Sequence, residues 1–205
     1  MDLKDRFLST FENWILSEQK RSDYWIYLET QYSEPFRAYH NLAHLEELFR
    51  YYDEFKSELK HPIEVAFAIF YHDCIYDIWS KKNEKLSAEK AISHLENEKI
   101  PKQCLDRIYN LILVTKDHTS TSNPDELWMI DFDLAILGQP WDTYENYTTL
   151  IRREYKKVPS ILYRKGRKKV LKHFLEKAHI FQTETFQNRF EAQARHNLTH
   201  ELNLL

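Results

Sequence analysis

Apolar residues recur at helical spacing through most of the chain. Near the N-terminus, Phe7, Phe11, Trp14 and Ile15 lie at positions i, i+4, i+7 and i+8, which predicts an amphipathic helix over about residues 2–18. Similar stripes, started by capping residues or prolines, predict the helices that follow. These are expected at about 22–34, 41–55, 62–70, 83–98, 101–115, 124–138, 142–156, 160–179 and 183–201, with Ser22 capping the first of them. We therefore expect an all-α protein.

One segment is apolar on every side. The run Val65–Phe70 has no polar face, so the helix that contains it is predicted to be central, and residues 71–82 after it to be irregular. Only 2 of 205 residues are glycine. Sandwiches and barrels need glycine in many tight turns, so this scarcity favours helices and also excludes a glycine-rich phosphate loop. Because no repeat or change in composition divides the chain, we expect one domain over residues 1–205.

The charge and composition narrow the class of protein. A formal net charge of -3 does not favour nucleic acid as a partner, and the basic run Arg164–Lys169 is interpreted as a solvated helix face. The 2 cysteines are too few for a disulfide framework. No apolar run approaches the roughly 20 residues of a membrane span, and the charged N-terminus does not resemble a signal peptide. We expect a cytoplasmic protein with no membrane partner.

The candidate chemistry centres on His72 and Asp73, which directly follow the central apolar run. Burying an unpaired carboxylate or imidazole is costly, so these groups need partners. We predict that His44, His72, Asp73 and Asp131 meet around one divalent metal ion. A mixed nitrogen and oxygen set suits Mn, Mg, Fe, Co, Ni or Zn and does not choose among them. The alternative is that His44 is a packed histidine and that the aspartates cap helices.

The same residues carry a resemblance to a known family. The matching blocks are Arg37–His44, Phe70–Asp77, Asn83–Ala88, Asp131–Gly138 and Ile151–Tyr155, with further similarity in Gly166–Leu171. In this order they resemble the HD superfamily of metal-dependent phosphohydrolases, and within it a subgroup of HD phosphohydrolases of about this length. The resemblance implies an HD-domain helical bundle with its metal site between helices, and His44, His72, Asp73 and Asp131 as the ligands.

The resemblance also implies a hydrolase that acts on a small-molecule or nucleotide phosphoester through metal-activated water. Several residues are candidates to complete that site. Glu84 is a candidate general base, Lys116 and His118 are candidates to contact phosphate or protonate the leaving group, and Asp133 is expected to act beside the ligands. The candidate substrate-binding residues are Arg37, His40, Asn83 and Arg152. For each, a solvated surface role or a helix-start role is the open alternative.

Two rival functions remain open. Histidines between the HD pair and the last aspartate, His94 and His118, would be needed for a dinuclear-iron oxygenase of the HD type, although His94 is expected to face solvent. The other rival is a non-catalytic protein that binds metal or nucleotide. The sequence names neither the substrate nor the oligomeric state.

Overall fold

The computed structural model describes residues 1–119 and 121–205, and in them the fold is all-α, as predicted. The chain divides into two compact units, Met1–Met129 and Ile130–Leu205. The first contains α1 (Leu3–Thr10), α2 (Glu18–Tyr32), α3 (Leu42–Phe55), η1 (Lys56–Glu58), α4 (Pro62–Tyr71), α5 (Asn83–Leu95), α6 (Lys102–Leu113) and the start of α7 (Pro124–Leu134). The second contains the end of α7, η2 (Ala135–Gly138), α8 (Trp141–Glu154), η3 (Tyr155–Lys157), α9 (Ser160–Glu176) and α10 (Glu184–Leu204). The expectation of one domain stays a prediction.

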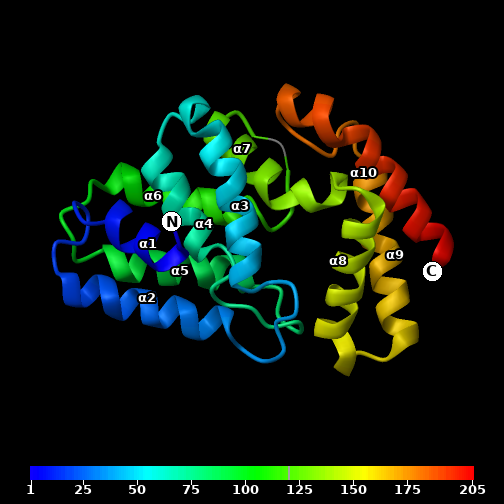
Figure 1. Cartoon of the computed structure of the whole chain (residues 1–205), viewed down its shortest axis with the longest axis horizontal. Helices are drawn as coiled ribbons and strands as arrows, with labels where there is room; N and C mark the ends of the chain where they lie inside the picture. Colours follow the sequence, from blue (N-terminus) through cyan, green and yellow to red (C-terminus); the bar gives the residue numbers. More distant parts are fainter. Residues whose placement is uncertain (120) are drawn as a thin grey trace. The chain divides into compact units, whose positions relative to one another are not determined.

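Helix α4 is the centre of the first unit, as its apolar sequence predicts. It packs against α3, α5 and α6, and every residue from Glu64 to Tyr71 is buried (Figure 1). The ring of Phe70 contacts Phe7 of α1, Trp25 of α2 and Phe49 of α3, with centroid distances of 5.1, 6.3 and 4.6 Å. Burial on all sides holds the C-terminal end of α4 in place, and His72 and Asp73 directly follow that end.

The first two helices differ from the prediction. Helix α1 ends at Thr10, and the Ser17 side chain accepts a hydrogen bond from Lys20 N to cap α2, so the expected helix over 2–18 and the Ser22 cap are wrong. A serine can bond to the backbone ahead of it and so start a new helix, even without a glycine or proline to end the first. The predicted buried stripe is nevertheless correct, because Phe11 and Ile15 are both buried.

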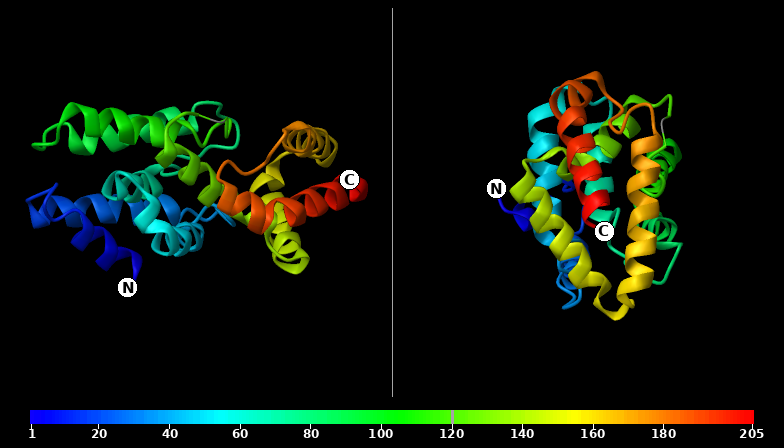
Figure 2. Two further views of the ribbon diagram at one scale, coloured as in Figure 1. Left: turned by 90° about the horizontal axis from the view of Figure 1, so that it is seen from above. Right: turned by 90° about the vertical axis from the view of Figure 1, so that its right-hand side faces the viewer.

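In the second unit, α8 and α9 diverge from η3, and α10 runs between them (Figure 2). A buried polar network joins these three helices. The Arg167 guanidinium of α9 donates two hydrogen bonds to the Glu201 carboxylate of α10, of 2.7 and 2.8 Å, and the Tyr144 hydroxyl of α8 donates to the same carboxylate.

None of the helices in the described residues combines the length and apolar character needed to cross a bilayer.

The two glycines predict opposite effects of the same substitution. A Cβ atom at Gly138 would lie 2.5 Å from Phe190 Cβ, whereas a Cβ at Gly166 on α9 would meet nothing within 4 Å. We expect Gly138→Ala to lower the free energy of unfolding by about 1–3 kcal/mol through overpacking. Gly166→Ala should raise it by roughly 0.5–1 kcal/mol, because alanine is the better helix former. Urea unfolding of both variants checks this, and a neutral Gly138→Ala would contradict the close approach.

Candidate metal centre

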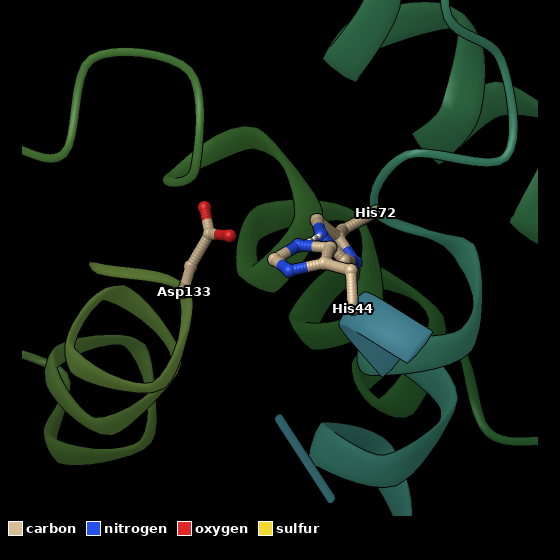
Figure 3. Close-up of side chains that lie close together, drawn as sticks. All are labelled: His44, His72 and Asp133. Atoms are coloured by element: carbon tan, nitrogen blue, oxygen red, sulfur yellow. Dashed lines mark hydrogen bonds between the residues drawn. The ribbon is translucent and has the colours of Figure 1, made fainter. Parts of the chain in front are cut away.

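Two imidazoles face each other in the first unit. His44 lies in the first turn of α3, where Asn41 is the N-cap, and His72 directly follows α4. Their Nε2 atoms are 3.2 Å apart, and both side chains are almost fully buried (Figure 3). Two nitrogens bound to one ion at about 2.1 Å, with tetrahedral or octahedral angles, would lie about 3.0–3.4 Å apart. The observed spacing therefore fits two ligands of one metal ion.

A hydrogen bond at the other side of the His72 ring fixes its tautomer. His72 Nδ1 lies 2.9 Å from the carbonyl oxygen of Ile69. A carbonyl oxygen can only accept, so Nδ1 carries a proton, and in the neutral ring Nε2 then presents its lone pair toward His44. Metal-bound histidines in proteins are held by this kind of second bond, which orients the ring and makes the free nitrogen a better donor. The arrangement thus prepares Nε2 of His72 for metal binding.

Asp73 adds an oxygen to the two nitrogens. Its Oδ2 lies 3.4 Å from His72 Nε2. The backbone of Asp73 is fixed on both sides: its N–H donates to the Tyr32 hydroxyl at 3.2 Å, and its carbonyl accepts from Arg37 Nη1 at 2.7 Å. Because these two hydrogen bonds fix the main chain, the Asp73 carboxylate extends from a backbone whose position is well defined. In the first unit, His72 Nε2 therefore lies close to both His44 Nε2 and Asp73 Oδ2, and binding of one ion by all three residues stays a prediction.

Helix α5 secures the irregular segment that follows Asp73. The Asn83 side chain accepts from Asp77 N at 3.2 Å and donates to Asp77 O at 3.0 Å. One turn later, Ser87 Oγ accepts from Ile75 N at 3.0 Å and donates to Ile75 O at 3.3 Å. Asn83 and Ser87 share a helix face at i and i+4, so each satisfies both backbone groups of one residue in the segment. The Asn83 side chain thus stabilises this segment through two hydrogen bonds with Asp77, and its contact with substrate stays a prediction.

His40 lies before α3 and not on it. Its ring is nevertheless close to the site. His40 Nε2 lies 3.9 Å from Asp73 Oδ2, and its ring centroid is 4.5 Å from that of Tyr76. The half-buried imidazole faces the Asp73 carboxylate, which supports a role in orienting that group.

The two aspartates of α7 in the second unit differ in what their carboxylates do. Asp131 is fully buried and accepts from Gln182 N at 2.6 Å, Thr183 N at 2.8 Å and Thr183 Oγ1 at 2.7 Å, at the start of α10. Burial raises the pKa of Asp131 to about 6, and these hydrogen bonds oppose the rise. Asp133, also labelled in Figure 3, is only half-buried. The Asp131 carboxylate therefore holds the segment that leads into α10, next to the N-cap Thr183, and its predicted role as a metal ligand stays a prediction.

The two candidate arginines are bonded to protein carbonyls. Besides Asp73 O, Arg37 donates to His40 O and Cys74 O at 3.2 Å each, and to Glu34 at 3.1 Å. Bidentate binding of a substrate phosphate needs adjacent guanidinium donors, so these bonds favour a positioning role for Arg37 over the predicted contact with substrate. In the second unit, Arg152 donates to Tyr155 O and Val158 O and lines a cavity of about 380 Å³. Substrate binding by Arg37 and by Arg152 stays a prediction.

The remaining candidates lie elsewhere in the first unit. Glu84 is half-buried in the first turn of α5, where the helix dipole favours a carboxylate, and Lys116 is exposed in the turn after α6. Within the described residues, neither forms an ion pair or hydrogen bond with His44, His72 or Asp73. His118 has a φ of 47°, which is uncommon for a residue with a Cβ atom. Their catalytic roles stay predictions.

His94 does not face solvent as expected. Its ring stacks on Tyr24 at a centroid distance of 4.0 Å, and its Nδ1 forms a 2.7 Å hydrogen bond with the Tyr71 hydroxyl. The edge of Tyr27 completes this aromatic surround. Burial lowers the pKa of His94 to about 4, and Lys90 adds to the effect. The polar neighbours of His94 in the sequence hid this position, because the three tyrosines come from α2 and α4.

The lowered pKa predicts a pH dependence of stability. Between pH 6.5 and about 4, the unfolded chain protonates His94 and the folded chain does not, so acidification through this window should destabilise the protein. The Asp131 carboxyl contributes a pH dependence of the opposite sign. Because its pKa is raised in the folded chain, its contribution to stability falls as pH rises from 3.8 to about 6. Comparing urea midpoints of wild type and His94→Gln cancels the Asp131 contribution. We expect the wild type to lose more stability than the variant on acidification, and parallel profiles would contradict the assignment.

Comparison of the chain with protein-family models, with curated proteins and with solved structures finds no match. The histidine and aspartate side chains near α3 and α4, together with the sequence pattern, therefore carry the information about function.

Proposed function

We propose that the protein is a metal-dependent phosphohydrolase of the HD type, acting on a small-molecule or nucleotide phosphoester. The observation that carries the proposal is the pair of Nε2 atoms of His44 and His72, 3.2 Å apart, with the His72 tautomer fixed by Ile69 O. The order of blocks in the sequence supplies the reaction class. A bound divalent ion would polarise a phosphoryl oxygen and lower the pKa of a water molecule.

We infer that the ligands from the first unit are His44, His72 and Asp73, and that α7 supplies a further carboxylate. Asp133 is the better candidate for that carboxylate than the predicted Asp131. Both oxygens of Asp131 already accept hydrogen bonds from residues 182 and 183, whereas Asp133 is only half-buried. His40 would orient the Asp73 carboxylate, and Arg37 would hold the turn that carries it.

Substitution of the two α7 aspartates separates these roles. We expect Asp133→Asn to weaken metal binding by at least ~100-fold, since loss of even an outer-shell partner typically costs 10–100-fold. Asp131→Asn should keep the metal and lower stability, because it replaces one of two buried acceptor oxygens, which together accept three hydrogen bonds, by an amide group that can only donate. Calorimetric titration of both metal-free variants with Mn²⁺ checks the assignment. The reverse pattern would restore Asp131 as the ligand.

The proposed reaction is tested by a hydrolysis screen. The metal-free full chain would be incubated with phosphomonoesters, phosphodiesters and nucleoside triphosphates, each with Mn, Mg, Fe, Co, Ni or Zn. We expect release of phosphate or of the alcohol from at least one class, lost in Asp73→Ala. Two equivalents of iron with a visible absorption band and no hydrolysis would favour the oxygenase. Bound metal without any turnover would favour the non-catalytic protein.

A further inference from the structure

Positive charge is concentrated in one segment of the second unit. Residues 151–170 contain nine lysines and arginines and a single acidic residue, Glu154, although the whole chain has a formal net charge of -3. The segment forms the end of α8, the turn η3 and the first half of α9. A segregation this strong in an acidic chain creates a local positive field that attracts anionic partners.

Two large aliphatic side chains are exposed at the same place. Ile161 is 83% exposed and Leu162 is 59% exposed, in the first turn of α9, which begins shortly after η3. We call this segment, residues 153–165, the basic tip; Figure 1 shows it where the yellow ends of α8 and α9 join. Its exposed basic residues are Arg153, Lys156, Lys157, Arg164 and Lys165. In the described residues none of these five forms an ion pair with an acidic side chain.

The outer face of α9 continues this surface. Lys165, Lys169 and Lys172 are exposed and follow Ile161 or Leu162 at helical spacing. The opposite face is occupied by the buried residues Arg167, Leu171 and Phe174, which pack toward the unit's interior. Helix α9 therefore has one face buried in the unit's interior and an outer face that is cationic and begins with two exposed aliphatic residues.

The conformation of the basic tip is fixed from inside. Arg152 donates hydrogen bonds to Tyr155 O and Val158 O and to Ser160 Oγ, and its guanidinium lies 4.6 Å from the Tyr163 ring centroid. These contacts link the end of α8 to the start of α9 across η3. A surface that is already ordered loses less entropy on docking than a mobile loop would.

We propose that the basic tip docks on an anionic membrane surface, with Ile161 and Leu162 inserted among the lipid acyl chains and the surrounding lysines and arginines facing the headgroups. A bilayer interface accommodates both features, since it buries aliphatic side chains and attracts basic ones. A nucleic acid would satisfy the charges but leave Ile161 and Leu162 in water, and stacking on bases requires aromatic side chains instead. This mode lies on the surface and needs no membrane-spanning helix.

Vesicle flotation of the full chain tests the proposal. Vesicles of phosphatidylcholine with phosphatidylserine should float the wild type at low salt, and vesicles of phosphatidylcholine alone should not. Ile161→Ser/Leu162→Ser should reduce the bound fraction at least about tenfold, as expected for removing two inserted aliphatic side chains. Lys156→Glu/Lys157→Glu/Lys165→Glu should abolish binding. The matched control is Ile26→Ser, which removes a 57% exposed aliphatic residue of α2 in the first unit and should leave binding unchanged.

Circular dichroism of each variant confirms that it is folded before the comparison is made. Wild-type-like flotation of Ile161→Ser/Leu162→Ser would overturn the proposal, because insertion would then contribute nothing. Absence of flotation for the wild type at low salt would also overturn it. So would tight binding of a single-stranded RNA by the wild type that outcompetes the vesicles, because the basic tip would then be a nucleic-acid surface. None of these outcomes depends on metal or hydrolysis.

Discussion

Replacing His72 with alanine is expected to weaken binding of a divalent metal by at least ~100-fold and to abolish hydrolysis. The substitution removes one of two nitrogens that face each other at 3.2 Å and leaves His44 without the second donor. It also removes the ring that Ile69 O holds in the metal-binding tautomer. Mn²⁺ titration of the metal-free variant measures the loss. His72→Gln, which keeps a polar side chain of similar length, should be equally defective if the imidazole nitrogen is a ligand.

The control for His72→Ala is His173→Ala. His173 is exposed on α9 in the second unit, so its removal should change neither the metal content nor the activity. An unchanged Mn²⁺ affinity in a folded His72→Ala protein would mean that the two imidazoles form a packed hydrogen-bonded pair. That outcome would favour the structural alternative left open by the sequence.

The largest loss of stability is expected from Arg167→Met. This substitution leaves the Glu201 carboxylate, which is 6% exposed, without its two hydrogen bonds from the guanidinium. An uncompensated buried charge typically lowers the free energy of unfolding by about 3–5 kcal/mol. The Tyr144 hydroxyl, which donates to the same carboxylate, cannot replace the lost positive charge. Urea unfolding at neutral pH measures the change.

A double-mutant cycle isolates the ion pair from the rest of the network. Arg167→Met/Glu201→Leu should be considerably more stable than Arg167→Met alone, because it removes both charges and buries apolar side chains instead. If the two single effects simply add, the guanidinium and the carboxylate do not depend on each other and the account of this network is wrong.

The helices and the core could be predicted because their signals are local. Asn41, Pro62 and Pro124 start helices where expected, and the unbroken apolar run in α4 predicted its central position. The failures are also local. The start of α2 was misplaced because Ser17 and Ser22 are both acceptable caps, and only the packing of the following residues decides between them.

The candidate site was predictable in its residue types and only partly in its geometry. The sequence pointed to His44, His72 and Asp73 as ligands, and the first unit places His72 beside each of the other two. It named Asp131 as the last ligand and could not foresee the hydrogen bonds that Asp131 accepts, because its partners, Gln182 and Thr183, lie some fifty residues later in the chain. The role of the Ile69 carbonyl was equally hidden, since any residue at position 69 would supply one.

The buried role of Arg167 had a signal that was missed. The basic run suggested a solvated helix face, yet Arg167, Leu171 and Phe174 lie at i, i+4 and i+7. A charged residue in register with an apolar stripe is expected to be buried with a partner, and Glu201 on α10 is that partner. The other basic residues of the run fall on the remaining faces and are exposed or half-buried.

The central claim is that His44, His72 and Asp73 hold a divalent metal ion. Elemental analysis of the purified full chain beside its Asp73→Ala variant, each after incubation with the six candidate metals and removal of excess, tests it most directly. The account predicts about one equivalent of metal in the wild type and a large loss in the variant. No metal in either protein, or the same amount in both, would contradict it.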